Sequence, residues 1–97
     1  MKFRSERAFT DATIEVAQRY GHTVMHMRGN TFRLIQGLAG YPDLTLAKNA
    51  EVKFWELKMP DGKLTANQLT WSYALYPRWR CYRPENWDEM VKVLSGR

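Results

Sequence analysis

The sequence predicts one α/β domain in which a sheet is flanked by helices, in the order αβββαβα. The chain has 97 residues, of which 44% are hydrophobic and 13% are aromatic, so it can build one core but not two. Segments with the apolar spacing of helices are separated by short segments typical of strands. Elements in such an order pack as layers around a single core. We therefore expect one domain over residues 1–97.

The first half of the chain predicts one helix and three strands. Apolar residues recur at spacings of three and four from Phe9 to Tyr20, which indicates a helix that Gly21 ends. Pro42 is tolerated in a strand because it comes first, and the segment KNAE has the composition of a turn. The expected bounds are 5–20 for the helix, 22–27, 42–47 and 51–58 for the strands, and 28–41 for an irregular loop.

The second half predicts a turn, a helix, a strand and a last helix. Pro77 ends the first of these helices because proline cannot continue a helix. Asn86 followed by Glu89 has the spacing of a helix cap, and Gly96 is placed to end the last helix. The expected bounds are 59–63 for the turn, 65–76 and 86–94 for the helices, and 79–83 for the strand.

Charge and cysteine content narrow the class of protein. Lys and Arg total 15 against 10 acidic residues, a net charge of +5, which favours an anionic partner such as nucleic acid. Cys81 is the single cysteine, so neither an internal disulfide nor a zinc cluster of cysteines can form. No segment approaches the length of an apolar membrane span, and the N-terminus lacks the apolar run of a signal peptide. We expect a cytoplasmic protein with no membrane partner.

A pair of charged residues stands in a segment that otherwise resembles a buried strand. Glu56 and Lys58 point to one face of the strand because side chains alternate, and the preceding strand brings Asp43 to the same end of the sheet. Two carboxylates close together repel unless a cation lies between them, and oxygen ligands select magnesium or manganese. The alternative is a surface ion pair of Glu56 with Lys58 on a solvated face, with Asp43 as a turn residue.

The order and spacing of these residues resemble a known nuclease core. Proline and aspartate open one strand, and glutamate, one apolar residue and lysine follow in the next, as in the PD-(D/E)xK nucleases. More closely, GYPDLTL, FWELKMPDGKLTANQ and CYRPENWDEMVKVL are similar to the virus-type replication-repair nuclease (VRR-NUC) family, in the small stand-alone form found in phages. The similarity extends from Glu6 to Leu94 and is weakest at residues 28–39. It implies a restriction-endonuclease-like core with a mixed sheet, acting in the cytoplasm of a bacterial host.

The resemblance also implies metal-dependent hydrolysis of phosphodiester bonds in DNA. It assigns Asp43, Glu56 and the backbone carbonyl of Leu57 to the metal. It assigns Lys58 to the attacking water, which this lysine would orient or activate. A divalent metal creates a nucleophile near neutral pH and neutralises charge that develops on the phosphate. The expected cofactor is therefore Mg²⁺ or Mn²⁺.

Two further residues have both a catalytic and a structural interpretation. Glu6 lies at the flank of the apolar stripe of the first helix, and the resemblance adds it to the metal site, often through water. Alternatively, Glu6 is an acid favoured at a helix start by the helix dipole. Thr65 and Gln68 form a capping box by spacing, whereas the resemblance places Gln68 at the catalytic site. Both interpretations of Gln68 can hold at once.

Two histidines, His22 and His26, lie four residues apart and therefore on one face of the first predicted strand. A zinc site would need further soft ligands that the sequence does not offer near them. We expect these two histidines to be structural or to line a groove.

Basic residues near the expected cleft would hold the DNA backbone by charge, without sequence preference. These residues are Arg4, Arg7, Arg28, Arg33 and Lys63. Stand-alone members of the resembled family are homodimers that resolve junctions, which implies a homodimer acting on duplex or branched DNA such as a Holliday junction. The alternative function is a non-catalytic module that holds nucleic acid or another protein on a nuclease-like fold, and a third is a structural phage protein.

Overall fold

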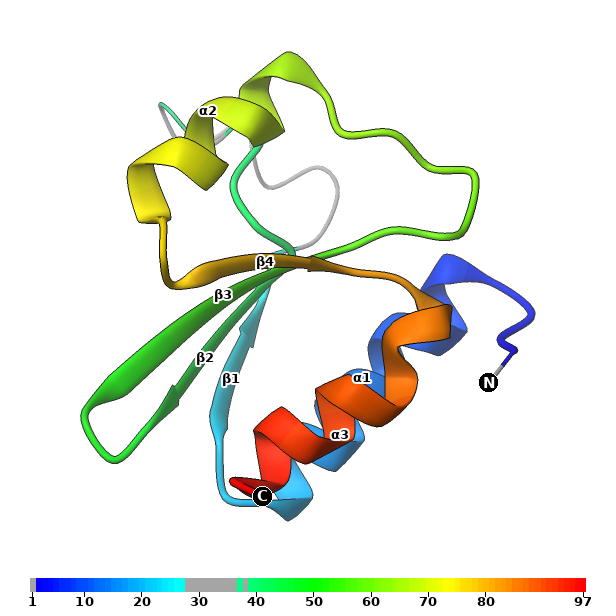
Figure 1. The fold of residues 1–97 in the computed structure, drawn as a ribbon, viewed down its shortest axis with the longest axis vertical. Coiled ribbons are helices and arrows are strands. Elements are labelled where there is room, and N and C mark those ends of the chain that lie inside the picture. The colour runs from blue at the N-terminus through cyan, green and yellow to red at the C-terminus, as the bar shows by residue number, and fades with distance from the viewer. Residues whose placement is uncertain (1, 28–36, 38) are drawn as a thin grey trace.

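The computed structural model describes residues 2–27, 37 and 39–97, and in this part of the chain it has an α/β fold with a mixed sheet and three α-helices (Figure 1). The predicted order of elements is confirmed, and each predicted boundary lies within two residues of the observed one. The elements are α1 (Glu6–Arg19), β1 (Thr23–His26), β2 (Leu44–Lys48), β3 (Glu51–Leu57), α2 (Ala66–Leu75), β4 (Trp79–Tyr82), the 3-10 helix η2 (Pro84–Asn86) and α3 (Trp87–Ser95).

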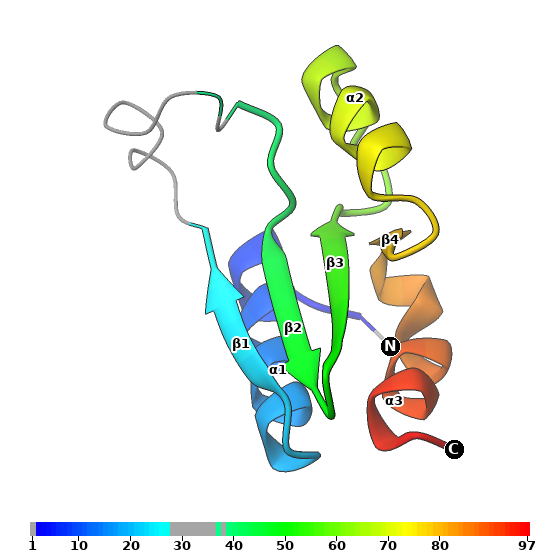
Figure 2. The same cartoon turned by 90° about the vertical axis from the view of Figure 1, so that its left-hand side faces the viewer.

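The sheet has four strands in the order β1-β2-β3-β4. The first three strands pair antiparallel, while β4 pairs with β3 in parallel, with Glu56 opposite Cys81 and Leu57 opposite Tyr82. A tight turn joins β2 to β3, and its central residues Asn49 and Ala50 both have positive φ values. Consequently β1 and β3 end, and β2 begins, at the same end of the sheet (Figure 2).

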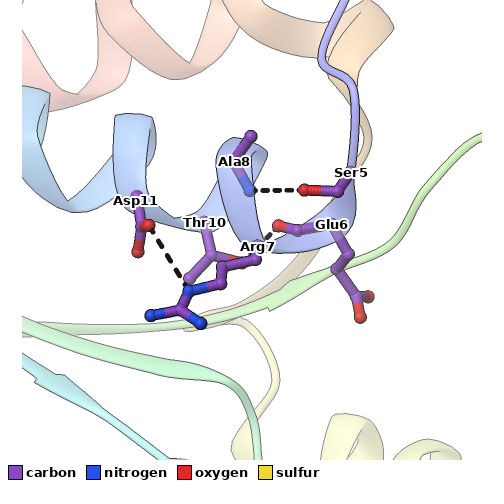
Figure 3. Close-up of polar contacts among 6 residues, drawn as sticks. All are labelled: Ser5, Glu6, Arg7, Ala8, Thr10 and Asp11. Carbon is purple, nitrogen blue, oxygen red and sulfur yellow. Dashed lines mark hydrogen bonds and ion pairs between the residues drawn. The ribbon is translucent and has the colours of Figure 1, made fainter.

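The helix α1 begins and ends with standard caps. The Oγ of Ser5 accepts a hydrogen bond of 3.1 Å from the backbone N–H of Ala8, as drawn in Figure 3. At the other end Gly21 has a φ of 87° and donates its N–H to the carbonyl of Gln18, which satisfies one of the last free carbonyls. The predicted stop at Gly21 is therefore confirmed.

The two faces of the sheet are covered unequally. Figure 1 shows α1 and α3 side by side on one face and α2 on the other. The core lies between the sheet and the pair α1 and α3, and its buried apolar residues are Phe9, Ala17, Leu44, Leu46, Trp55, Leu57, Tyr82, Met90 and Leu94. In contrast, Ser72 is the only buried residue of α2. The helix α2 is therefore held by a few specific contacts and not by a broad apolar face.

One predicted cap is wrong. The side chain of Asn86 makes no capping hydrogen bond to α3. Its Oδ1 instead accepts a hydrogen bond of 2.8 Å from the backbone N–H of Arg83, because the chain turns through η2 before α3 begins. The predicted stop is confirmed, since Gly96 ends α3 with a left-handed φ of 76°.

Among the described residues, no helix combines the length and the apolar character that crossing a bilayer requires.

Candidate active site

The carboxylate of Asp43 is held where three strands meet. Its Oδ2 accepts a hydrogen bond of 2.9 Å from the backbone N–H of Leu57, the last residue of β3. The carbonyl of Asp43 accepts a hydrogen bond of 2.9 Å from the N–H of Met27, which follows β1. The position of Asp43 just before β2 therefore ties it to both neighbouring strands, at the end of the sheet where β3 ends.

The carboxyl group of Glu56 is buried beside Asp43. Only 2% of Glu56 is exposed, and its Oε1 has no hydrogen-bond partner among the described residues. Burial, followed by the negative charge of Asp43, raises the pKa of Glu56 to about 9; the charge of Glu6 adds to this rise, and the charge of Lys58 opposes it. Glu56 is therefore a protonated acid near neutral pH unless a cation joins it.

Lys58 follows β3 immediately and is half-buried. Its backbone N–H donates a hydrogen bond of 3.0 Å to the carbonyl of Tyr82, which extends the parallel pairing of β3 with β4 by one residue. Lys58 forms no ion pair with Glu56 within 4.0 Å. The burial of Glu56 thus contradicts the alternative of a surface ion pair on a solvated face.

Gln68 connects α2 to the buried acid. The side-chain Oε1 of Gln68 accepts a hydrogen bond of 2.9 Å from the backbone N–H of Thr65. The backbone N–H of Gln68 donates a hydrogen bond of 3.1 Å to Oγ1 of Thr65, so the predicted capping box is confirmed. The Nε2 of the same side chain donates a hydrogen bond of 3.1 Å to Oε2 of Glu56. One glutamine therefore caps the helix and contacts the site at the same time.

Glu6 lies at the start of α1, close to the two acids but apart from them. Figure 3 shows its carboxylate pointing away from the neighbouring pair of Arg7 and Asp11, whose Nε and Oδ2 are 3.9 Å apart. Glu6, Thr10 and Asp43 line one pocket of about 340 Å³, which β1 also borders. Glu6 is exposed, so it faces solvent from the wall of this pocket.

His22 and His26 have different environments. His22 is buried, and its Nε2 lies 2.9 Å from the carbonyl oxygen of Leu94, a contact that joins the end of α3 to the start of β1. The prediction of a structural role is confirmed for this residue. His26 lines the same pocket as Glu6, and its Nδ1 is buried without a hydrogen-bond partner among the described residues.

A hard divalent cation fits the donor set of this site in part. Asp43 and Glu56 offer carboxylate oxygens, and the free Oε1 of Glu56 is a buried atom with no protein partner. Within the described residues, however, no three or more His, Cys, Asp or Glu side chains are grouped closely enough to hold a metal. Glu6 lies in the wall of the pocket that Asp43 also lines.

The structure describes three of the five predicted DNA-binding residues. Arg4, Arg7 and Lys63 are exposed, and Arg7 lies on the wall of the pocket that Glu6 and Asp43 line. Arg28 and Arg33 lie outside the described residues.

Two residues near the site had no role in the sequence prediction. Cys81 pairs with Glu56 across β3 and β4, and burial raises the pKa of its thiol. Arg83 donates two hydrogen bonds from Nη1 to the carbonyls of Met59 and Gly62, at 2.8 and 2.7 Å. Arg83 lies in the segment CYRPENWDEMVKVL, but its partners lie 24 and 21 residues away, so no local spacing identifies them.

Comparison of the chain with family models, curated proteins and solved structures found no match.

Proposed function

We propose that this chain is a DNA endonuclease that depends on Mg²⁺ or Mn²⁺ and has a site of the PD-(D/E)xK type, similar to the VRR-NUC family. The observation that carries the proposal is the buried carboxyl group of Glu56 beside the half-buried carboxylate of Asp43 at the end of β3, with Lys58 as the first residue after this strand. Two adjacent carboxyls in a buried place are unfavourable in themselves, because each opposes ionisation of the other. Such arrangements concentrate at functional sites.

Each residue has a distinct task in the proposed reaction. Asp43 and Glu56 would hold the metal through carboxylate oxygens, with the carbonyl of Leu57 beside them. When bound, the metal supplies a nucleophile near neutral pH and charge neutralisation at the phosphate. Lys58 would orient the attacking water and offset negative charge as a fixed cation. Gln68 would hold the carboxylate of Glu56 in one orientation through its 3.1 Å hydrogen bond.

Glu6 has an outer position in this scheme. Because it lies in the wall of the pocket that Asp43 also lines, it would act on the site through water and through its negative charge. Its removal should weaken the reaction less than the removal of Asp43 or Glu56 does.

The substrate in this proposal is duplex or branched DNA, such as a Holliday junction, bound by a homodimer. Arg4, Arg7 and Lys63 would contact the backbone, and such contacts weaken as salt increases. One site cuts one strand, so cutting both arms of a junction needs two sites related by symmetry. Sedimentation at the assay concentration tests the dimer, and a monomer that still resolves junctions would exclude it.

A second function is a non-catalytic module that holds nucleic acid. The observation that favours it is the raised pKa of Glu56, which keeps this buried acid protonated near neutral pH in the absence of a metal. This module would bind DNA through its basic surface and leave it uncut.

The decisive experiment compares cleavage by the wild type, Lys58→Ala and Lys53→Ala. Lys53 lies in β3, five residues before Lys58 and near the exposed Glu51, and serves as the matched control for loss of one lysine. Four-way junction, flap, duplex and single-stranded DNA are incubated with Mg²⁺, Mn²⁺ or a chelator. The nuclease proposal expects metal-dependent products with the wild type and Lys53→Ala and none with Lys58→Ala. Binding without cleavage in every metal would support the module instead.

A further inference from the structure

The turn after β3 is tied to the end of β4 by one arginine. The Nη1 of Arg83 donates hydrogen bonds to the carbonyls of Met59 and Gly62, at 2.8 and 2.7 Å. The turn is closed on itself by a 2.9 Å hydrogen bond from the N–H of Gly62 to the carbonyl of Met59. Arg83 is half-buried and is itself anchored through its backbone N–H to Oδ1 of Asn86. The turn 59–62 is thus held to β4 by a charged donor, which makes stronger hydrogen bonds than a neutral one.

This turn lies against the side chain of Lys58. A Cβ built on Gly62 would be 3.2 Å from Cδ and 3.5 Å from Cβ of Lys58, so the bare backbone of Gly62 packs against the aliphatic stem. The N–H of Lys58 donates to the carbonyl of Tyr82, which places Lys58 beside the residue that precedes Arg83. The turn therefore forms a wall along one side of Lys58.

A lysine side chain has four rotatable bonds, so its ammonium group samples many positions unless its stem is confined. A catalytic group works well only when its geometry is held, and misplacement by about 1 Å can cost about a hundredfold in rate. Lys58 follows β3 directly at the end of the sheet that holds the two acids, and its positive charge acts on Glu56 there. A wall that confines the stem would hold the ammonium group in one position relative to the acids.

We propose that Arg83 is a positioning residue, which holds the turn 59–62 against Lys58 and thereby keeps the ammonium group directed toward Asp43 and Glu56. The inference rests on the proposed function for its catalytic meaning, whereas the contact between turn and lysine stands independently of it. Arg83 acts through Lys58 and touches no reacting atom in this scheme.

The first test measures the accessibility of Lys58 without using activity. Trace acetylation followed by mass spectrometry gives the reaction rate of each lysine in the wild type, Arg83→Ala and Arg83→Lys. Loss of two hydrogen bonds should free the turn, so the rate at Lys58 should rise roughly threefold or more in Arg83→Ala, while the rate at the exposed Lys63 stays unchanged. Removing a neighbouring cation would by itself favour the protonated, unreactive amine and slow the reaction, so a faster reaction indicates release of the side chain.

Arg83→Lys keeps the charge and retains donors for the carbonyls, so the rate at Lys58 should return toward the wild-type value. Arg80→Ala is the matched control, because Arg80 is an exposed arginine of β4 whose Nη1 donates a hydrogen bond to the carbonyl of its neighbour Trp79. Its acetylation pattern should equal that of the wild type. An unchanged rate at Lys58 in folded Arg83→Ala overturns the proposal.

The second test is the division between kcat and KM in DNA cleavage. Arg83→Ala should lower kcat by roughly 10- to 100-fold and leave KM within about twofold, because ground-state contacts to DNA are intact. A raised KM with unchanged kcat would mean that Arg83 binds the substrate directly, which contradicts a positioning role. If the wild type cleaves no DNA, the proposed function fails, and the acetylation result still decides whether Arg83 confines Lys58.

A variant that leaves Arg83 in place tests the same contact in case Arg83→Ala does not fold. Gly62→Ala introduces a methyl group 3.2 Å from Cδ of Lys58 and so displaces the stem from the wall. The proposal expects faster acetylation of Lys58 and a lower kcat in this variant too. Normal acetylation and normal kcat in Gly62→Ala would overturn the idea that the turn confines the lysine.

Discussion

The side-chain amide of Gln68 donates a 3.1 Å hydrogen bond to the buried carboxyl group of Glu56. The two residues belong to different elements, since Gln68 lies in the first turn of α2 and Glu56 near the end of β3. The same amide caps α2 through the backbone N–H of Thr65. The orientation of a sparsely packed helix is therefore coupled to the orientation of the buried acid.

This coupling predicts different effects of Thr65→Ala and Gln68→Ala. Thr65→Ala removes the hydroxyl that accepts from the N–H of Gln68, which should cost about 1 kcal/mol of unfolding free energy. Gln68→Ala removes the reciprocal cap and also the contact to Glu56. We expect both variants to lose a similar free energy of unfolding in urea. Only Gln68→Ala should also lose about tenfold in cleavage rate, which is the effect expected when one hydrogen bond to a charged group is lost.

Thr65→Ala serves here as the control for a weakened helix start. Equal cleavage rates in Thr65→Ala and Gln68→Ala would show that the cap alone matters, and that the contact of Gln68 with Glu56 has no role in the reaction.

Glu56→Gln should make the metal-free protein more stable while it removes activity. Glutamine keeps the shape of Glu56 and an acceptor for Gln68, but it carries no charge that burial and Asp43 would oppose. In a chelator at pH 8, we expect the melting temperature to rise by about 5 °C, which corresponds to roughly 1 kcal/mol in a domain of this size. Glu51→Gln, at an exposed place on the same strand, should leave it unchanged. A lower melting temperature for Glu56→Gln would mean that a charged Glu56 stabilises the fold.

The stability of the metal-free wild type should fall as the pH rises from about 5 to 9. Burial and the charge of Asp43 raise the folded-state pKa of Glu56 from 4.5 to about 9, so the folded chain retains a proton that the unfolded chain has released. The contribution of Glu56 is fully present below pH 4.5 and is lost as the pH rises through 9. Urea unfolding in a chelator at several pH values measures this slope. The slope should be weaker in Glu56→Gln, and an identical slope in both proteins would contradict the assignment.

Local patterns were sufficient to predict the elements of this fold. The apolar spacing from Phe9 to Tyr20, the turn at 48–51 and the prolines and glycines at element ends are short-range signals, and each observed helix and strand follows from one of them. The predicted cap at Asn86 is the exception. Its side chain accepts a hydrogen bond from the N–H of Arg83, in a turn that helix spacing does not reveal.

Strand alternation predicted which candidate residues share a face, but it did not predict the environment of these residues. Alternation along β3 placed Glu56 and Lys58 on one face, but the burial of Glu56 depends on α2, which covers that face from outside the strand. Likewise the contacts of Arg83 join segments more than 20 residues apart. A single sequence gives no distance between such segments, so the interpretation of a solvated face could not be excluded before the fold was known.

The position of α2 also depends on a close approach at Gly40, which gives the last prediction. Gly40 has a φ of 82°, and a Cβ built there would lie 2.4 Å from the backbone carbon of Asn67 in α2. Next to it, the indole Nε1 of Trp71 donates a 3.0 Å hydrogen bond to the carbonyl of Ala39, and the rings of Tyr41 and Trp71 pack edge to face. Gly40→Ala should push α2 away from this contact and break the hydrogen bond between Gln68 and Glu56.

We expect Gly40→Ala to lower the unfolding free energy by roughly 2 to 4 kcal/mol, since it adds a backbone clash to an unfavourable φ. Gly96→Ala is the matched control, because Gly96 has a φ of 76° with no atom within 4 Å of the added Cβ. It should lose only the conformational part, about 1 kcal/mol. Urea unfolding gives both values, and cleavage under conditions where both variants are folded gives their activities. Because Gly40 packs against α2, which holds Gln68 against Glu56, Gly40→Ala should lose activity and Gly96→Ala should retain it. Full activity in folded Gly40→Ala would show that the acid is oriented without the help of α2.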